Sequence, residues 1–434
     1  MLVHAGQILN QRYVGGGASW YKRLLLNFGF HLFAGLFVVL YLTGVLRWGF
    51  GFYQDMSLNQ QYSLLAAALG YILTILLLRM FLRYPGARSL SLILPTVLGV
   101  FLFVSTLFLF LRLEYSRGVL LTSFTLIFAW CLAGYVVGSR LVCLRIALVA
   151  SGDVSYLREI SGLDITLLES PSLEGENFDA VVADLHSNSL GPDWQSFLAR
   201  CTLERIPVYH AKQITEAISG RVRIQHLSEN NIGSLLPSPL YENVKRAMDV
   251  AALVVTAPLT IPLMALVAMA IKLDDGGPIF FVQKRIGFRG EPFQMIKFRS
   301  MIVQSDDSGP AYTKADNDQR ITRVGKVIRR LRIDEMPQFW NVLKGQMSLI
   351  GPRPESTDLS EWYGNDVPFF LYRHVVRPGI SGWAQVNQGY AAEVDGMTRK
   401  LEYDFYYIKH FSFWLDVMIL LKTFRTLLTG FGAR

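Results

Sequence analysis

The sequence predicts a multi-domain membrane protein: a bundle of four transmembrane helices, a small α/β module, and an α+β domain with a re-entrant membrane helix and interfacial helices. Three observations predict this fold class. Of the 434 residues, 51% are hydrophobic and 18% are charged, an unusual balance for a soluble protein of this length. Four apolar runs have the length of about 20 residues that crosses a bilayer. Buried-strand patterns follow them and alternate with helical segments.

The bundle is expected within residues 1–140. Its four apolar runs lie near residues 24–46, 62–82, 90–111 and 119–139. Basic residues gather before the first run, between the second and third, and after the fourth: Lys22, Arg23, Arg79, Arg83, Arg88, Arg140 and Arg145. The positive-inside rule then places both ends of the bundle in the cytoplasm. A plain anchor and a transport pathway both fit four spans, but no acidic residue lies within a span, which favours the anchor.

Residues 141–236 are expected to form the α/β module. The segments "CLRIALVA", "FDAVVADL" and "IPVYH" are typical of buried strands, and "SYLREI" and "WQSFLARCTL" of the helices between them. Such alternation predicts a parallel sheet of Rossmann- or flavodoxin-like type. The turn "ASGDVSYL" lacks the G-x-G-x-x-G glycines that let a backbone approach a pyrophosphate. We therefore expect no nucleotide here, and a role in regulation or in forming a homodimer.

A long apolar run opens the third domain, residues 237–434. It covers "VKRAMDVAALVVTAPLTIPLMALVAMAIKLDDGGP", with Pro258 and Pro262 near its middle, where each proline removes a helix hydrogen bond. A fifth span would export the basic segments "QKRIGFRG", "KFRSM" and "VIRRLR", against the positive-inside bias. A re-entrant helix near 246–273, which enters and leaves on the cytoplasmic face, avoids both conflicts.

The C-terminal segment "HFSFWLDVMILLKTFRTLLTGFGAR" mixes apolar residues with Lys422, Arg425 and Arg434. It is too short and too charged to span a membrane comfortably, so an interfacial helix and a core helix are the two interpretations.

Two strands around a Gly-rich turn are predicted in "GGPIFFVQKRIGFRGEPFQMIKFRSM". Lys297 and Arg299 are two residues apart, so on a strand they would face the same side. Two cations on one face suit a diphosphate, and they also suit a charged edge strand that avoids edge-to-edge pairing.

Adjacent carboxylates stand in "RIDEMPQFWNVLKGQMSLIGPRPE", at Asp334 and Glu335. Pro337 favours a helix that begins there and stops near Gly345, although a longer helix kinked at Pro337 fits as well. Neighbouring helical residues point about 100° apart, so divided roles suit this pair better than a shared proton. One carboxylate would attack while the other binds a metal or handles a proton, and helix N-capping is the bland alternative.

Further polar candidates follow the carboxylates. Arg353 stands between two prolines in "IGPRPE", a rigid setting for bidentate phosphate recognition. The segment "RPGISGWAQVNQG" holds Arg377 and the amide Gln385, which suits either a loop that reads a base or sugar or a purely structural loop.

Several classes of protein are disfavoured. The three cysteines have no C-x-x-C spacing, which argues against a disulfide framework or a zinc site. The net charge of +8 would suit nucleic acid, but no interleaved aromatic and basic patch supports it, so we expect no nucleic-acid partner. Anionic lipid headgroups and phosphorylated substrates remain. A transporter would need paired halves, which the sequence lacks.

A family resemblance rests on six stretches in one order: "KRAMDV", "GPIFFVQKRIG", "MIKFRSM", "RIDEMPQFWNVLKGQMSLIGPRPE", "RPGISGWAQVNQG" and "YDFYYI". Together they resemble the bacterial polyprenyl-phosphate sugar-1-phosphate transferases, the monotopic phosphoglycosyl transferases. The upstream bundle and α/β module resemble the large, WbaP- or WcaJ-like architecture of that family.

The resemblance implies a reaction. The family transfers a sugar-1-phosphate from a UDP-sugar to undecaprenyl phosphate, releases UMP and uses Mg²⁺. It thereby begins exopolysaccharide, O-antigen or capsule repeat units. The alternative is a catalytically inactive membrane scaffold or regulator of polysaccharide assembly. The expected location is the bacterial inner membrane, in contact with its lipids, with the active site on the cytoplasmic face.

The resemblance also implies site residues. Asp334 would attack the sugar-bearing phosphate, and Glu335 would be its partner in catalysis and in metal binding. Pro258 would bend the re-entrant helix, although Ala257 stands where many relatives have serine. The substrate-binding candidates are Lys297, Arg299, Arg353, Arg377, Gln338 and Gln385.

Overall fold

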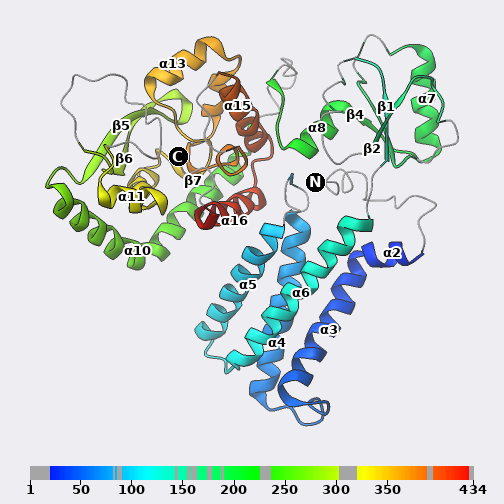
Figure 1. Ribbon diagram of the computed structural model, residues 1–434, viewed down its shortest axis with the longest axis horizontal. Coiled ribbons are helices and arrows are strands. Elements are labelled where there is room, and N and C mark those ends of the chain that lie inside the picture. Colours follow the sequence, from blue (N-terminus) through cyan, green and yellow to red (C-terminus); the bar gives the residue numbers. More distant parts are fainter. Residues whose placement is uncertain are drawn as a thin grey trace. The chain divides into compact units, whose positions relative to one another are not determined.

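The computed structural model (Figure 1) describes most of the chain. The described residues are 20–81, 84–85, 90–141, 145–152, 154, 157, 164–173, 178–185, 187, 190–224, 236–302, 320–388 and 394–429. They form two compact units, Met1–Gly220 and Arg221–Arg434. The predicted boundary between bundle and α/β module, at residue 140, lies inside the first unit and stays a prediction.

The first unit begins with a short helix and four long ones: α2 (Trp20–Leu26), α3 (Phe28–Trp48), α4 (Leu58–Phe81), α5 (Leu90–Phe110) and α6 (Arg117–Leu141). The long helices pack side by side as a bundle (Figure 1). Each is long and apolar enough to cross a membrane, as is one helix of the second unit. The protein is therefore membrane-associated, as its composition predicts.

A parallel sheet with strand order β2-β1-β3-β4 follows the bundle in the chain. Its elements are β1 (Arg145–Val149), β2 (Asp164–Leu168), β3 (Ala180–Ala183), α7 (Pro192–Leu203), β4 (Val208–His210) and α8 (Ala211–Ser219). Alternate side chains of β1 explain the layers, because Leu148 packs towards α8 and Val149 towards α7. Figure 1 shows these two helices on opposite faces of the sheet.

The parallel pairing agrees with the predicted alternation, but the sequence analysis missed β2 and α8. The expected helix "SYLREI" falls largely outside the described residues. The Rossmann- or flavodoxin-like assignment stays a prediction.

Within its described residues, the second unit combines helices with two strand pairs, β5 with β6 and β7 with β8. Its first elements are α10 (Pro239–Asp275), β5 (Phe280–Ile286), η4 (Phe288–Gly290), β6 (Pro292–Phe298), α11 (Arg323–Arg330), η5 (Ile333–Glu335) and α12 (Gln338–Leu343). The remaining ones are β7 (Ser348–Ile350), α13 (Thr357–Asp366), η6 (Phe370–Val375), β8 (Gly379–Ser381), α14 (Trp383–Asn387), α15 (Val394–Lys409) and α16 (Phe413–Thr429). The predicted hairpin is confirmed, because β5 and β6 pair antiparallel across the expected turn.

Helix α10 packs against other elements on both sides of an exposed apolar middle. Leu253 packs beside β6 and α12, and Val267 and Ile271 pack beside α11. Between these contacts, Val255 and Leu259 are 79% and 76% exposed. Figure 1 shows the helix as two arms that meet at a bend. The exposed middle suits contact with lipid, while re-entry into the membrane stays a prediction.

The bend in α10 has local causes. Pro258 and Pro262 lie inside the helix, and neither can donate a backbone hydrogen bond. The hydroxyl of Thr256 also donates to the carbonyl of Ala252 at 2.8 Å, a side-chain bond that bends helices. Ala257 has no hydroxyl to make such a bond before Pro258, but Thr256, one residue earlier, supplies one.

The C-terminal helix α16 confirms the core-helix interpretation, while an interfacial position stays a prediction. Leu415, Met418 and Ile419 are fully buried, whereas Leu420 and Phe424 are 60% and 51% exposed. One side is therefore core, and the other offers apolar surface to an interface.

The close approach of the backbone at Gly379 to that at Gly351 gives the first prediction. A Cβ added to Gly379 on β8 would collide with the backbone of Gly351, just after β7. We expect Gly379→Ala to lower the free energy of unfolding by about 2 kcal/mol, because backbone atoms cannot yield as flexible side chains do. The matched control is Gly364→Ala on α13, where the new methyl group meets nothing within 4 Å. It should stabilise by about 0.5–1 kcal/mol. Equal thermal midpoints for the two variants would contradict the prediction.

Candidate active site

The two carboxylates lie on a tight turn between two helices. Helix α11 ends at Arg330, and Arg332 then adopts the left-handed conformation with φ 57°. The 3-10 turn η5 follows, and Pro337 caps the start of α12. The structure thus has a helix that begins after the carboxylates, and no continuous helix from Gly325. Reversal of the chain at Arg332 is what brings both acids to one position beside β6.

Apolar contacts hold this turn against α10. Ile333 and Met336, which flank the acids, pack on the cluster formed by Val267, Ile271, Phe298 and Ile328. The second arm of α10 therefore supports the carboxylate turn directly.

Glu335 is a buried anion with two arginine partners. Both amino groups of Arg353 donate to its carboxylate, at 2.7 and 3.3 Å, and Arg332 donates at 3.4 Å. Burial alone would raise the pKa of Glu335, but Arg353 and Lys297 outweigh burial and lower it to about 2. Glu335 is therefore ionised throughout the neutral range and suited to orient Arg353.

Asp334 has a different environment from its neighbour. Its Oδ1 atom is buried and has no hydrogen-bond partner among the described residues. Burial, followed by repulsion from Glu335, raises the pKa of Asp334 against the opposing effect of Lys297. A carboxylate with an unpartnered oxygen is poorly solvated, which makes it a more reactive nucleophile or a free metal ligand.

Lys297 completes the cluster from strand β6. Loss of hydration, followed by repulsion from Arg353, lowers the pKa of Lys297 to about 8. Glu335 and Asp334 oppose this effect, while Arg285 adds to it. The ammonium is thus charged at neutral pH and lies among two acids and two arginines.

A second layer of buried charges supports Arg353. Arg373 donates to the backbone carbonyl of Arg353 at 2.8 Å and to Glu355 at 3.2 Å, and pairs with Asp404 at 2.8 Å. Lys400 makes a close ion pair with Glu355. The carbonyl of Pro354, next along the chain, accepts a bond from Arg285 at 3.3 Å. The segment that presents Arg353 is therefore held by side chains from three other elements.

Sequence reasoning missed this second layer. The signal was present for Glu355, which follows the two prolines in "GPRPE". Arg285 and Asp404 lie in the stretches "GPIFFVQKRIG" and "YDFYYI", whereas Arg373 and Lys400 lie in none of the six. Only the fold makes these residues neighbours.

Arg299 is the cation predicted to share a face with Lys297. Strand β6 ends at Phe298, so Arg299 lies beyond the strand and makes a close ion pair with Asp275 at the end of α10. A shared cationic face of Lys297 and Arg299 stays a prediction. The backbone N–H of Arg299 still donates to the carbonyl of Ile279 at 2.9 Å, so the backbone pairing continues one residue past Phe298.

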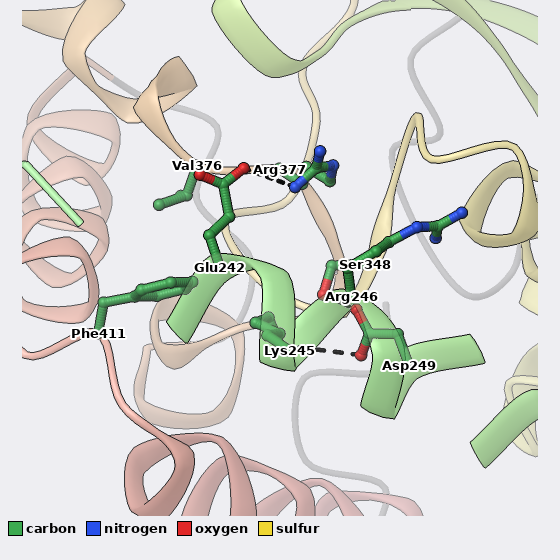
Figure 2. A pocket seen from close by; sticks show the side chains of 8 residues that line it. All are labelled: Glu242, Lys245, Arg246, Asp249, Ser348, Val376, Arg377 and Phe411. Atoms are coloured by element: carbon green, nitrogen blue, oxygen red, sulfur yellow. Dashed lines mark hydrogen bonds and ion pairs between the residues drawn. The ribbon is translucent and has the colours of Figure 1, made fainter. Parts of the chain in front are cut away.

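Arg377 occupies a different place, beside the first arm of α10. It pairs with Glu242 at 2.6 Å and donates to the carbonyl of Gly345 at 3.1 Å. Figure 2 shows Glu242 and Arg377 at a small cavity of about 10 Å³ that Lys245 and Asp249 also line. Such a cavity holds about one water molecule, so it suits hydration better than a sugar nucleotide. A substrate-binding role for Arg377 stays a prediction.

Each of the two candidate amides has one side-chain atom without a hydrogen-bond partner among the described residues. Gln338 is buried at the start of α12, and its Nε2 has no partner among the described residues. Gln385 on α14 donates to Ile380 at 3.2 Å, and its Oε1 is likewise without a described partner. Among the described residues no hydrogen bond joins either amide to Glu335, so their roles stay predictions.

The donor set is compatible with Mg²⁺. The free Oδ1 of Asp334 is a hard oxygen ligand, and Mg²⁺ is usually held by one or two carboxylates plus substrate phosphates and water. Within the described residues no group of three acidic, histidine or cysteine side chains forms a complete site. Asp334 would thus be the first protein ligand. Glu335 would be the second, and its carboxylate would then bind the metal as well as Arg353.

Comparisons with known proteins find relatives of this chain. A family model described as bacterial sugar transferase matches residues 240–430. The chain is 48% identical over 417 residues to the UDP-N-acetylgalactosamine-undecaprenyl-phosphate N-acetylgalactosaminephosphotransferase of Aeromonas hydrophila, which covers 96% of this chain and 98% of the relative.

Other relatives match over a shorter region. The UDP-glucose:undecaprenyl-phosphate glucose-1-phosphate transferase of Xanthomonas campestris pv. campestris is 43% identical over 164 residues, 37% of this chain and 34% of the relative. The protein of the same name from Escherichia coli (strain K12) is 40% identical over 205 residues, 44% and 43% of the two chains.

Proposed function

Because the chain belongs to the bacterial sugar transferase family, we propose that it transfers a sugar-1-phosphate from a UDP-sugar to undecaprenyl phosphate and releases UMP. One observation carries this proposal beyond family membership. The turn presents Asp334, whose buried Oδ1 has no hydrogen-bond partner among the described residues, beside an ionised Glu335 that is bonded to Arg353. This arrangement suits phosphoryl transfer, in which a nucleophile and fixed cations do most of the work.

The proposed sugar is inferred from a relative that covers 96% of this chain. That relative acts on UDP-N-acetylgalactosamine, whereas the named glucose transferases match less than half of this chain. We take UDP-N-acetylgalactosamine as the donor. The product would begin the repeat unit of a surface polysaccharide at the bacterial inner membrane.

The first half-reaction begins at Asp334. A carboxylate oxygen of Asp334 attacks the sugar-bearing phosphorus, a P–O bond forms, and the bond to the bridging oxygen breaks. UMP leaves with the bridging oxygen, and the sugar phosphate remains on Asp334 as an acyl phosphate. An enzyme nucleophile divides one difficult transfer into two easier ones.

Cations offset the charge that gathers at this step. Lys297 and Arg353 lie around the two acids, and Glu335 keeps Arg353 in one orientation. When bound at Asp334 and Glu335, Mg²⁺ would neutralise phosphate oxygens and polarise the reacting phosphate. In the second half-reaction, a phosphate oxygen of undecaprenyl phosphate attacks the same phosphorus and frees the Asp334 carboxylate.

The membrane supplies the acceptor at the right depth. The acceptor phosphate lies in the headgroup layer, and the exposed apolar middle of α10 suits insertion beneath that layer. A re-entrant α10, bent at Pro258, would hold the carboxylate turn at the cytoplasmic surface, because the second arm of α10 packs against that turn. A homodimer is part of this proposal, with the α/β module as its contact.

UMP release by the purified protein tests the proposed function. With Mg²⁺, undecaprenyl phosphate and a panel of UDP-sugars, we expect the fastest release from UDP-N-acetylgalactosamine. With donor alone, release should stop near one UMP per protein, because the acyl phosphate cannot turn over without acceptor. Preference for another sugar would correct the donor but keep the reaction. A folded protein that releases UMP from no donor would overturn the proposal.

A further inference from the structure

Asn341 joins the strand that carries Lys297 to the helix that follows the carboxylates. Its side chain is 1% exposed, within α12. The Nδ2 group donates to the carbonyl of Gln294 at 2.7 Å, and Oδ1 accepts from the backbone N–H of Ile296 at 3.2 Å. A third bond runs from Nδ2 to Gln346 Oε1 at 2.9 Å.

The bonds from Asn341 to the backbone of Gln294 and Ile296 resemble those that a neighbouring strand would make. Gln294 and Ile296 are two residues apart on β6, so their backbone groups point to the same edge of the strand. In the described hairpin the other edge of β6 pairs with β5, and the Asn341 amide occupies the edge that β5 leaves open. The amide therefore sets the position of β6 along α12.

Apolar packing alone would not set this position. Phe293 and Met295 of β6 pack against Val342 and Met347, which holds the strand near the helix. Such contacts are non-directional and tolerate a small slide, whereas hydrogen bonds have a preferred distance and angle. The residue after Ile296 is Lys297, and α12 begins three residues after Glu335. A slide of β6 would therefore move the Lys297 ammonium away from the two acids.

We propose that Asn341 is a positioning residue, which fixes the Lys297 ammonium relative to Asp334 and Glu335 through its two bonds to β6. The inference rests on the proposed function, since Lys297 matters there as a cation beside the reacting phosphate. The described side-chain bonds of Asn341 go to Gln294, Ile296 and Gln346 and to neither acid nor Lys297, so its effect on the reaction is indirect.

The test separates correct folding from correct alignment. With UDP-N-acetylgalactosamine alone, the amplitude of the UMP burst counts competent sites, and its rate constant reports the first half-reaction. For Asn341→Leu we expect an amplitude near that of the wild type and a rate constant roughly tenfold to a hundredfold lower, since small misplacements have effects of this size. Gln346→Met is the matched control, because it removes the third bond and leaves both bonds to β6; its rate constant should stay within about threefold of wild type.

A second variant and hydrogen exchange complete the test. If Asn341→Leu does not fold, Asn341→Ser replaces it, with the same expected fall in rate constant. Hydrogen exchange should also become faster in β6 for the Asn341 variants and stay unchanged for Gln346→Met. A reduced amplitude with a wild-type rate constant would show a merely structural role and overturn the inference. A wild-type protein that releases no UMP from any donor overturns the proposed function, and this inference with it.

Discussion

Asp334→Asn is expected to abolish UMP release, with a fall of at least about a thousandfold in turnover. The amide is a poor nucleophile, so no acyl phosphate forms and the burst with donor alone disappears. The fold should survive the change. Burial and the neighbouring Glu335 both disfavour the Asp334 anion, since they raise its pKa, so a neutral side chain removes an unfavourable charge. We expect a thermal midpoint equal to or higher than that of the wild type.

The control for this prediction is Asp366→Asn, an exposed residue that ends α13 in the same unit. It makes the same chemical change away from the carboxylate turn and should keep wild-type turnover. Loss of activity together with retained stability in Asp334→Asn would support a chemical role for this carboxylate. Full turnover in Asp334→Asn would remove Asp334 as the nucleophile, even for a member of this family.

Arg373→Met is expected to be the most destabilising change of those considered, at about 3–5 kcal/mol. Arg373 is 2% exposed and neutralises both Glu355 and Asp404. Methionine fills a similar volume but leaves Asp404 without its ion-pair partner. Glu355 keeps its ion pair with Lys400. A buried anion that loses its partner costs far more than an exposed one, because water cannot take the place of the arginine.

Arg399→Met is the matched control, since Arg399 is exposed on the helix α15 that also carries Lys400 and Asp404. Its effect should stay within about 0.5 kcal/mol. The double variant Arg373→Met with Asp404→Asn should recover part of the loss, because the orphaned charge is removed as well. Thermal unfolding of the three proteins in one detergent checks the order. A midpoint for Arg373→Met close to that of Arg399→Met would disprove a structural role for the network.

The same network has a defined pH dependence. Burial would raise the pKa of Glu355, but Lys400 and Arg373 outweigh it and lower the pKa to about 2. A group with a depressed folded-state pKa stabilises above its unfolded pKa, near 4.5, and this contribution is lost as pH falls towards 2. The ion pairs of Glu355 therefore contribute fully at neutral pH.

Local patterns in the sequence were sufficient for much of the fold. Long apolar runs predicted four helices of membrane-crossing length, and alternation with a Gly-rich turn predicted the β5–β6 hairpin. Pro337 and Gly345 marked the start and the end of α12 within a few residues. These features depend on neighbours in the chain, so periodicity and turn chemistry reveal them. Short or irregular elements such as β2 carried too weak a pattern.

In the candidate site, too, the sequence predicted some features and the tertiary structure decided others. The sequence alone identified Asp334, Glu335, Lys297 and Arg353 as charged groups suited to phosphate chemistry, and the family motifs that hold them. Their pairing was decided by the tertiary structure. Arg353 reaches Glu335 from 18 residues away, and Asn341 bonds β6 from 45 residues away. Arg299, two residues from Lys297, makes its ion pair with Asp275 at the end of α10. The physical reason is that a side chain's type is local information, whereas its partners and its pKa depend on which distant segments the packed core brings within hydrogen-bond distance.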